Sequence, residues 1–381
     1  MNRVGIEPDL LRWARERSGK STDDLRRRFP RLEEWERGAV LPTFRQVEDF
    51  AKATHTPIGF LFLTEPPVEA LPLPDFRTVG DVAIRRPSPD LLDTIYLCQQ
   101  RQEWYREEAR IAGEPPLEFV GSLDTTTDPP AAAGQLGRAL GFDVEHRGQM
   151  STWSEALRQF IAQADGLGVL VMVSGIVGSN THRQLDPAEF RGFTLADAVA
   201  PLVFINGADT KAAQMFTLAH ELCHVWLGES GVSNAPAESA PDHRVERWCN
   251  EVAAELLAPA ELVRAEFAAA GELSDVVQRL ARRCKVSRLV AIRRLHDVGA
   301  LGWEEFRAAY REELARLDAL PPRSGGNAVR NVSARAGKRL TRTLIASALE
   351  GRTSYTEAYR LLGVRKQSSF ERIAESLGMG V

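Results

Sequence analysis

Two histidines four residues apart, with a glutamate beside the first, are the part of this 381-residue sequence best suited to chemistry. They are His220, Glu221 and His224, and the mainly apolar stretch around them, residues 216–227, contains no glycine or proline. Such a stretch favours a helix, and side chains at positions i and i+4 of a helix project from one face. Both imidazoles can then reach one tetrahedral zinc ion, while the glutamate takes a proton from water held there. This HExxH spacing indicates a metal-dependent hydrolase.

The alternative is a chance pattern, with ordinary surface histidines on an amphipathic helix. The flanking residues are Phe, Leu, Ala, Val and Trp, so the helix is expected to be buried. Buried polar groups without partners are costly, and a bound cation would provide the missing partner. The context therefore favours the metal site over the chance pattern.

A zinc ion bound in this way needs a third protein ligand and an open position for water. A second apolar helix is predicted just downstream, and Pro259 ends it. Spacing alone does not choose among its candidate ligands, which are His243, Glu246, Glu251 and Glu255. Glu246 shares an inward face with Asn250, whereas Glu251 is rotated by about 100° from Asn250. We favour Glu246.

Three segments together resemble the ImmA/IrrE family of metallopeptidases. Its pattern is roughly FTLAHExGH, then ExxAN or ExxCN, then AAxLLxP, and the matching segments here are Met215–His224, Glu246–Asn250 and Ala253–Pro259. The resemblance covers about residues 165–310. It implies a zincin-like domain of the gluzincin type.

The resemblance also implies roles for individual residues. The zinc ligands would be His220, His224 and Glu246, and Glu221 would be the catalytic base. Cys223 stands where the family usually has glycine. We expect it to be a small core residue, because its position turns it away from the face of the two histidines.

Contacts to the substrate or the transition state are expected from His243, Asn250 and Arg191. His243 is a candidate for stabilising the tetrahedral oxyanion. Arg191 lies in Glu189–Phe193, which we expect to be a connecting strand or loop beside the catalytic cleft. A structural ion pair is the favoured alternative role for Arg191.

Length and composition place these motifs in a protein of two or three domains. The hydrophobic content of 44% is enough for sizeable cores, and the net charge of −4 gives no general signal for nucleic-acid binding. The four cysteines are scattered without a CxxC pair, as in a reducing cytosol. No apolar run approaches the ~20 residues that span a bilayer. We expect a soluble cytoplasmic protein that does not bind membranes.

The order of short helices in residues 1–66 resembles an XRE-type helix-turn-helix domain, which implies a five-helix DNA-binding fold. Trp35–Gly38 and Leu41–Thr43 carry the resemblance. The expected recognition stretch is acidic, which disfavours contact with phosphates. Basic residues suited to DNA lie nearby, at Arg26, Arg27, Arg28 and Arg31. We expect DNA binding, with a protein-interaction module as the alternative.

The predicted fold class is α+β and mostly helical. Residues 67–164 are predicted as a linker and helical region, in which residues 71–78 form an extended, proline-stiffened link. Residues 165–315 are predicted as the metallopeptidase domain, with buried strands at 168–173 and 201–206 in a small sheet. Residues 325–381 are predicted as a basic helical unit, and contact with nucleic acid or an acidic partner protein is one interpretation of its charge. Solvated surface charge is the favoured alternative for this unit.

Two functions follow. The first is a zinc-dependent endopeptidase that cleaves a regulatory protein, expected to be a repressor, and is coupled to the helix-turn-helix domain in a stress or mobile-element response. The second is a DNA-binding transcription regulator, or the antitoxin-like component of a toxin–antitoxin module that binds a toxin. Its metal site would be structural or sensory. Glu221 weighs against a purely structural metal, because structural zinc sites are usually closed by four protein ligands.

Overall fold

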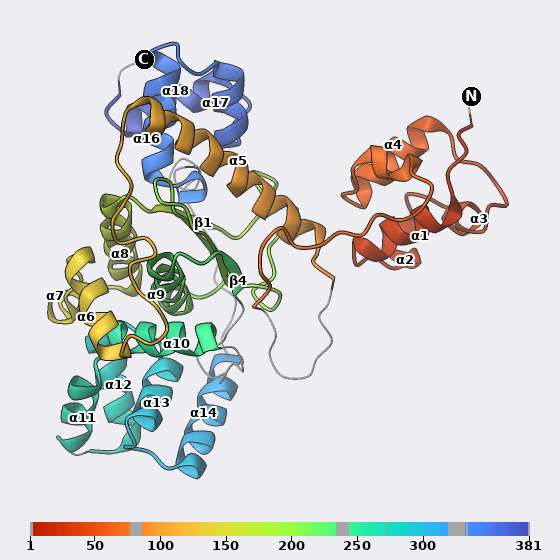
Figure 1. Ribbon diagram of the computed structural model, residues 1–381. Coiled ribbons are helices and arrows are strands. Elements are labelled where there is room, and N and C mark those ends of the chain that lie inside the picture. The colour runs from red at the N-terminus through yellow and green to blue at the C-terminus, as the bar shows by residue number, and fades with distance from the viewer. Residues whose placement is uncertain are drawn as a thin grey trace. The chain divides into compact units, whose positions relative to one another are not determined.

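The computed structural model of the protein describes residues 3–76, 86–233, 244–269, 271–318, 332 and 334–379. Contacts divide the chain into two compact units. The first consists of Met1–Pro72 and Ala83–Ile95, and the second of Leu73–Val82 and Tyr96–Val381. The described residues are mostly helical and include one small sheet (Figure 1). This composition agrees with the predicted α+β class.

The first unit is a set of short helices around an apolar core. Two of them begin with a capping box, formed by Ser21 with Asp24 and by Thr43 with Gln46. Each box satisfies main-chain N–H groups that a helix leaves open at its start. The elements are α1 Pro8–Arg17, α2 Thr22–Arg26, α3 Leu32–Glu36, α4 Phe44–Ala53 and the 3₁₀ helix η1 Ile58–Phe62.

Acidic residues of α3 are paired with arginines. Glu36 is buried and lies 2.7 Å from Arg15, and Glu34 lies 2.7 Å from Arg31. These pairs neutralise part of the acidic charge that the sequence placed on the recognition stretch. DNA binding by this unit stays a prediction.

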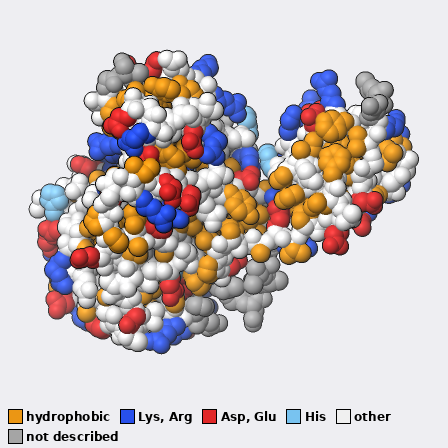
Figure 2. Space-filling model, turned by 45° about the horizontal axis from the view of Figure 1, so that its top comes forward, with side chains coloured by type: hydrophobic (Ala, Val, Ile, Leu, Met, Phe, Trp, Pro, Cys, Tyr) orange, Lys and Arg blue, Asp and Glu red, His pale blue; other side chains and the backbone are white. Residues whose placement is uncertain are grey.

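Hydrophobic side chains also reach the surface of the first unit. Figure 2 shows them gathered on the face in view. Phe44 and Phe62 stack with ring centroids 6.4 Å apart, although nearly half of each residue is exposed. The large exposed hydrophobic residues of this unit are Leu41, Phe44, Ile58, Phe62, Leu63 and Val68.

The second unit is built on a mixed four-stranded sheet in the order β1-β3-β2-β4. β1 (Leu170–Ser174) and β3 (Leu202–Asn206) are parallel and match the two predicted strands to within two residues. β2 (Gly192–Leu195) is antiparallel to β3 and overlaps the segment predicted as a strand or loop. β4 (Gly231–Ser233) pairs with β2 at the sheet edge and was not predicted.

Helices cover both faces of this sheet. Neighbouring residues of a strand point to opposite faces, so the apolar strands present hydrophobic side chains on each face. Val171 and Val203 point into a core shared with α8, α9 and α10. Met172 faces the other side, where its sulfur lies 3.9 Å from that of Cys98 on α5. The helices are α5 Pro89–Ile111, α8 Trp153–Leu167, α9 Lys211–Leu227 and α10 Arg244–Leu257.

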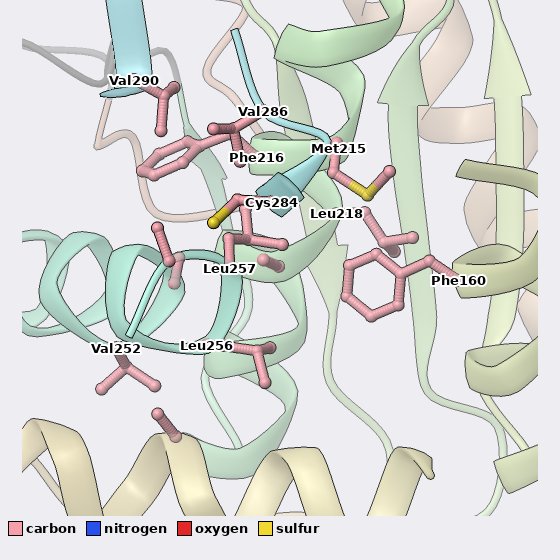
Figure 3. Close-up of a cluster of buried hydrophobic side chains, with 14 of the residues drawn as sticks. Phe160, Met215, Phe216, Leu218, Val252, Leu256, Leu257, Cys284, Val286 and Val290 are labelled. Atoms are coloured by element: carbon pink, nitrogen blue, oxygen red, sulfur yellow. The ribbon is translucent and has the colours of Figure 1, made fainter. Parts of the chain in front are cut away.

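The core between α9 and its neighbours fixes the helix that carries the histidines. Figure 3 shows Met215 and Leu218 of α9 beside Phe160 of α8 and Leu257 of α10. All four side chains are buried. Further helices extend this layer, namely α6 Pro129–Leu140, α7 Val144–Gly148, α11 Ala260–Ala268, α12 Leu273–Cys284, α13 Arg288–Asp297 and α14 Trp303–Asp318.

Three carboxy-terminal helices belong to the same compact unit as the sheet. The buried guanidinium of Arg101 on α5 joins them to it, by donating to the carbonyl oxygens of Leu361 at 2.9 Å and Arg335 at 2.8 Å. The start of the unit predicted at 325–381 lies outside the described residues. The helices are α16 Lys338–Leu349, α17 Tyr355–Leu362 and α18 Gln367–Ser376. Among the helices described, none has the length and apolarity needed to cross a membrane.

Candidate metal centre

Helix α9 presents His220, Glu221 and His224 inside the second unit. Thr210 caps its start by accepting a hydrogen bond from Ala213 N–H, and Gly228 ends it in the left-handed conformation that favours glycine. The three side chains are buried. Their burial in a helix fixed at both ends gives them little freedom to reorient.

Helix α10 packs across α9 and brings Glu246 to the two histidines. Nε2 of His224 lies 2.9 Å from Glu246 Oε1, and Nε2 of His220 lies 3.3 Å from Glu246 Oε2. The two Nε2 atoms are 3.2 Å apart. Ligands at about 2.05 Å from a tetrahedral zinc are separated by about 3.3 Å. The three side chains are therefore spaced as ligands of one small cation.

The polar atoms at this point lack the hydrogen bonds that burial demands. No described N–H or O–H is aligned to donate to Oε1 or Oε2 of Glu246. A buried carboxylate needs a partner of opposite charge, and in the absence of a metal only the two imidazoles beside it, of the groups that the structure describes, are placed to supply one. A divalent cation held by Glu246, His220 and His224 would provide that charge. Among the described residues, these three form a group whose ligand atoms lie close enough together to hold one metal ion. The donor set of two imidazoles and a carboxylate fits zinc.

The charges of the cluster depend on one another in the absence of metal. Burial disfavours the charged imidazolium of His220, but the Glu246 carboxylate outweighs it and raises the pKa of His220 to about 9. Burial likewise opposes ionisation of Glu246, and the adjacent His220 and His224 overcome it and hold its pKa far below the usual range. The site thus favours a negative charge on Glu246, as metal binding requires.

Asn250 positions the first histidine. Its Oδ1 lies 2.9 Å from Nδ1 of His220, so His220 donates from Nδ1 and presents Nε2 as the atom that a metal would bind. Asn250 comes one helical turn after Glu246, and this turn places both side chains on the α9 side of α10. The sequence predicted that shared face but assigned Asn250 to substrate contact. That contact stays a prediction.

Glu221 is held by β2 of the sheet. The hydroxyl of Thr194 lies 2.8 Å from Oε2, and Oε1 has no hydrogen-bond partner among the described residues. A Cβ at Gly192 would lie 2.8 Å from Oε1, so glycine leaves the room that the carboxylate occupies. Burial raises the pKa of Glu221, while His224, His220 and Thr194 lower it in part. The result is a carboxylate with one oriented oxygen and one available oxygen.

The remaining candidates lie elsewhere or outside the described residues. Glu251 is exposed, and Glu255 pairs with Arg294. Arg191 lies 3.8 Å from Asp209, which is the ion pair considered for it. Cys223 is buried, and its thiol faces the Ala219 carbonyl oxygen at 3.2 Å. His243 belongs to residues 234–243, which the structure does not describe.

Two regions of the chain match known domain families. Residues 164–296, which contain the whole cluster, match the IrrE N-terminal-like domain, a peptidase family. Residues 336–376 match a domain of unknown function, DUF8813. No curated protein matches the chain. The first match supports a metallopeptidase-like function of the ImmA/IrrE type, and such peptidases use a metal ion, typically zinc.

Proposed function

We propose that this chain is a zinc-dependent endopeptidase that cleaves a regulatory protein. The observation that carries the proposal is the buried meeting point of His220, His224 and Glu246 beside Glu221. It lies inside the region that matches a peptidase family. A structural zinc site would be closed by a fourth protein ligand, whereas the described residues supply three.

Each side chain has a separate task in this proposal. A zinc ion bound here supplies a Lewis acid that polarises a scissile carbonyl and acidifies water. His220, His224 and Glu246 hold it, and Asn250 keeps His220 in the required tautomer. Glu221 accepts the proton of the attacking water at Oε1 and returns it to the leaving amide nitrogen. Burial suits that role, because a raised pKa brings a carboxylate closer to working pH.

The substrate in this proposal is a regulatory protein such as a DNA-bound repressor. The support is the first unit, whose order of short helices resembles a helix-turn-helix domain. Such a domain attached to a peptidase can bring it to a target on DNA or bind the target protein directly. Cleavage of one repressor would then change transcription in response to stress or to a mobile element.

The test compares the wild type with Glu221→Gln in the host cell. Glutamine keeps the size of the side chain but cannot accept the proton. New protein amino termini are identified by mass spectrometry in cells that produce each protein at equal level. We expect a small set of cleavage products, including a regulator, in the wild type alone. The same set of products with Glu221→Gln would contradict the peptidase mechanism.

DNA binding by the first unit is the second candidate function. Four arginines within six residues favour it, and Arg26, Arg27, Arg28 and Arg31 are all exposed. Fluorescence anisotropy with a duplex from the protein's own upstream region tests it. Binding that weakens steeply with salt and is lost in the quadruple alanine variant supports DNA contact. Binding with no salt dependence contradicts it.

A further inference from the structure

The segment Leu73–Phe76 lies along the outer edge of β4, the edge that faces away from β2. In the sheet, β4 has β2 on one side only. On its other side, the Val232 N–H donates to the Pro74 carbonyl oxygen, and the Phe76 N–H donates to the Val232 carbonyl oxygen, both at 3.0 Å. These bonds form a parallel β-bridge between Asp75 and Val232. The chain itself therefore occupies the main-chain groups of the edge strand.

The ring of Phe76 covers a side chain of the metal centre. It stacks on the imidazole of His224, with ring centroids 5.6 Å apart and planes 11° apart. A Cβ at Gly231 would overlap atoms of the Phe76 ring, so glycine at that position of β4 is what leaves space for it. The backbone pairing and the ring contact thus place one segment over both β4 and a proposed zinc ligand.

The same edge adjoins the catalytic side of the sheet. Ser233 of β4 pairs with Gly192 of β2, which is the residue that leaves room for Glu221 Oε1. An extended peptide reaches a proteolytic centre most simply by adding as a strand to a free sheet edge. A substrate placed on β4 would need the N–H and carbonyl of Val232, which the segment already uses.

We propose that Leu73–Phe76 is an autoinhibitory strand that competes with the substrate for β4. This inference rests on the proposed peptidase function. Pro72 and Pro74 favour an extended backbone in this stretch, because proline fixes its own φ and disfavours the helical conformation in the residue before it. These two prolines restrict the backbone of the segment before it pairs with β4, so less conformational entropy is lost on pairing.

The segment and β4 belong to the same chain and the same compact unit, so the competition is intramolecular on the side of the segment. An intramolecular partner has an effective concentration of roughly the mM range. A protein substrate at lower concentration is excluded until the segment leaves β4.

The test measures access to β4 and to the metal in the zinc-loaded full chain. The probe is the dipeptide hydroxamate Leu-Phe-NHOH, whose binding is followed by calorimetry. Phe76→Ala removes the ring, and Phe76→Pro removes both the ring and the N–H that pairs with Val232. Val68→Ala is the matched control, because Val68 lies only a few residues before the segment and is 98% exposed. Hydrogen exchange at the Val232 amide is measured on the same samples.

We expect the hydroxamate to bind roughly tenfold more tightly to Phe76→Pro than to the wild type, with Phe76→Ala between them. The Val232 amide should exchange faster in Phe76→Pro, and Val68→Ala should match the wild type in both measurements. Equal hydroxamate affinity in the wild type and Phe76→Pro would overturn the inference, whether or not exchange changes. Tighter binding without any proteolysis would instead leave the inhibitory strand in place and contradict the peptidase function.

Discussion

The hydroxyl oxygen of Thr194 lies 2.8 Å from Oε2 of Glu221 and 3.0 Å from the main-chain carbonyl oxygen of the same residue. Both groups are buried. The sheet therefore holds the proposed catalytic base through a single side chain of β2. This contact fixes which carboxylate oxygen remains available for proton transfer.

Replacing Thr194 by valine should lower kcat by about ten- to hundredfold without loss of zinc. Valine keeps the shape of the side chain but cannot donate the hydrogen bond. In the wild type, burial raises the pKa of Glu221, and the hydrogen bond from Thr194 partly offsets that increase. The pKa of Glu221 should rise further, so the acidic limb of the pH–rate profile should move to higher pH. Thr194→Ser should restore the wild-type profile. An unshifted acidic limb in Thr194→Val would count against this role.

Loss of the Asn250 side chain should weaken zinc binding by about ten- to hundredfold. Alanine at 250 leaves Nδ1 of His220 without its 2.9 Å partner, so the ring and its tautomer are no longer fixed. A chromophoric chelator that competes for zinc measures the change. Unaltered affinity in Asn250→Ala would mean that this hydrogen bond does not prepare His220.

Glu246→Ala should abolish stoichiometric zinc binding. Glu246 is the carboxylate that faces both Nε2 atoms. Glu251→Ala is the matched control, because Glu251 lies on the same helix but is exposed. Metal content of the purified proteins is read by atomic emission. Full zinc content in Glu246→Ala would show that Glu246 is not the third zinc ligand.

Zinc affinity should increase with pH up to about pH 9. In the metal-free protein His220 has a pKa of about 9 instead of 6.5, so near neutrality it carries a proton that zinc must displace. Below that pKa the apparent affinity should gain about a factor of ten per pH unit, and above it the gain should stop. Chelator competition at several pH values measures the slope. A flat profile between pH 6.5 and 8.5 would exclude a protonated His220.

Gly192→Ala should destabilise the fold by about 1–3 kcal/mol, because the added methyl meets Glu221 and a carbonyl of β3. Gly166→Ala is the opposite case, since Gly166 lies in α8 with open space around it. That change should stabilise by about 0.5–1 kcal/mol. Chemical denaturation of both variants gives the comparison. Equal effects of the two changes would contradict the packing described around Gly192.

Local patterns predicted the elements that carry the proposed metal ligands. The apolar stretch around His220 had no helix breaker, and the β-branched runs at β1 and β3 were too short for helices. The spacing of Glu246 and Asn250 indicated the inward face of α10. These features depend on neighbours within one or two helical turns, which a single sequence displays.

Contacts between distant parts of the chain were beyond such patterns. β4 has three residues and β2 four, too few for a periodic signal. Thr194 reaches Glu221 only because β2 packs against α9. The sequence suggested a proline-stiffened link around Phe76 but not its partner. The main chain around Phe76 pairs with Val232, which lies more than 150 residues later in the sequence.

X-ray absorption at the zinc edge of the purified full chain tests most directly whether two imidazoles and a carboxylate share one ion. We expect one zinc per chain, with nitrogen and oxygen neighbours at about 2.0–2.1 Å and the scattering pattern of two histidines. A sulfur neighbour at about 2.3 Å, or a protein that binds no zinc, would contradict the proposed centre.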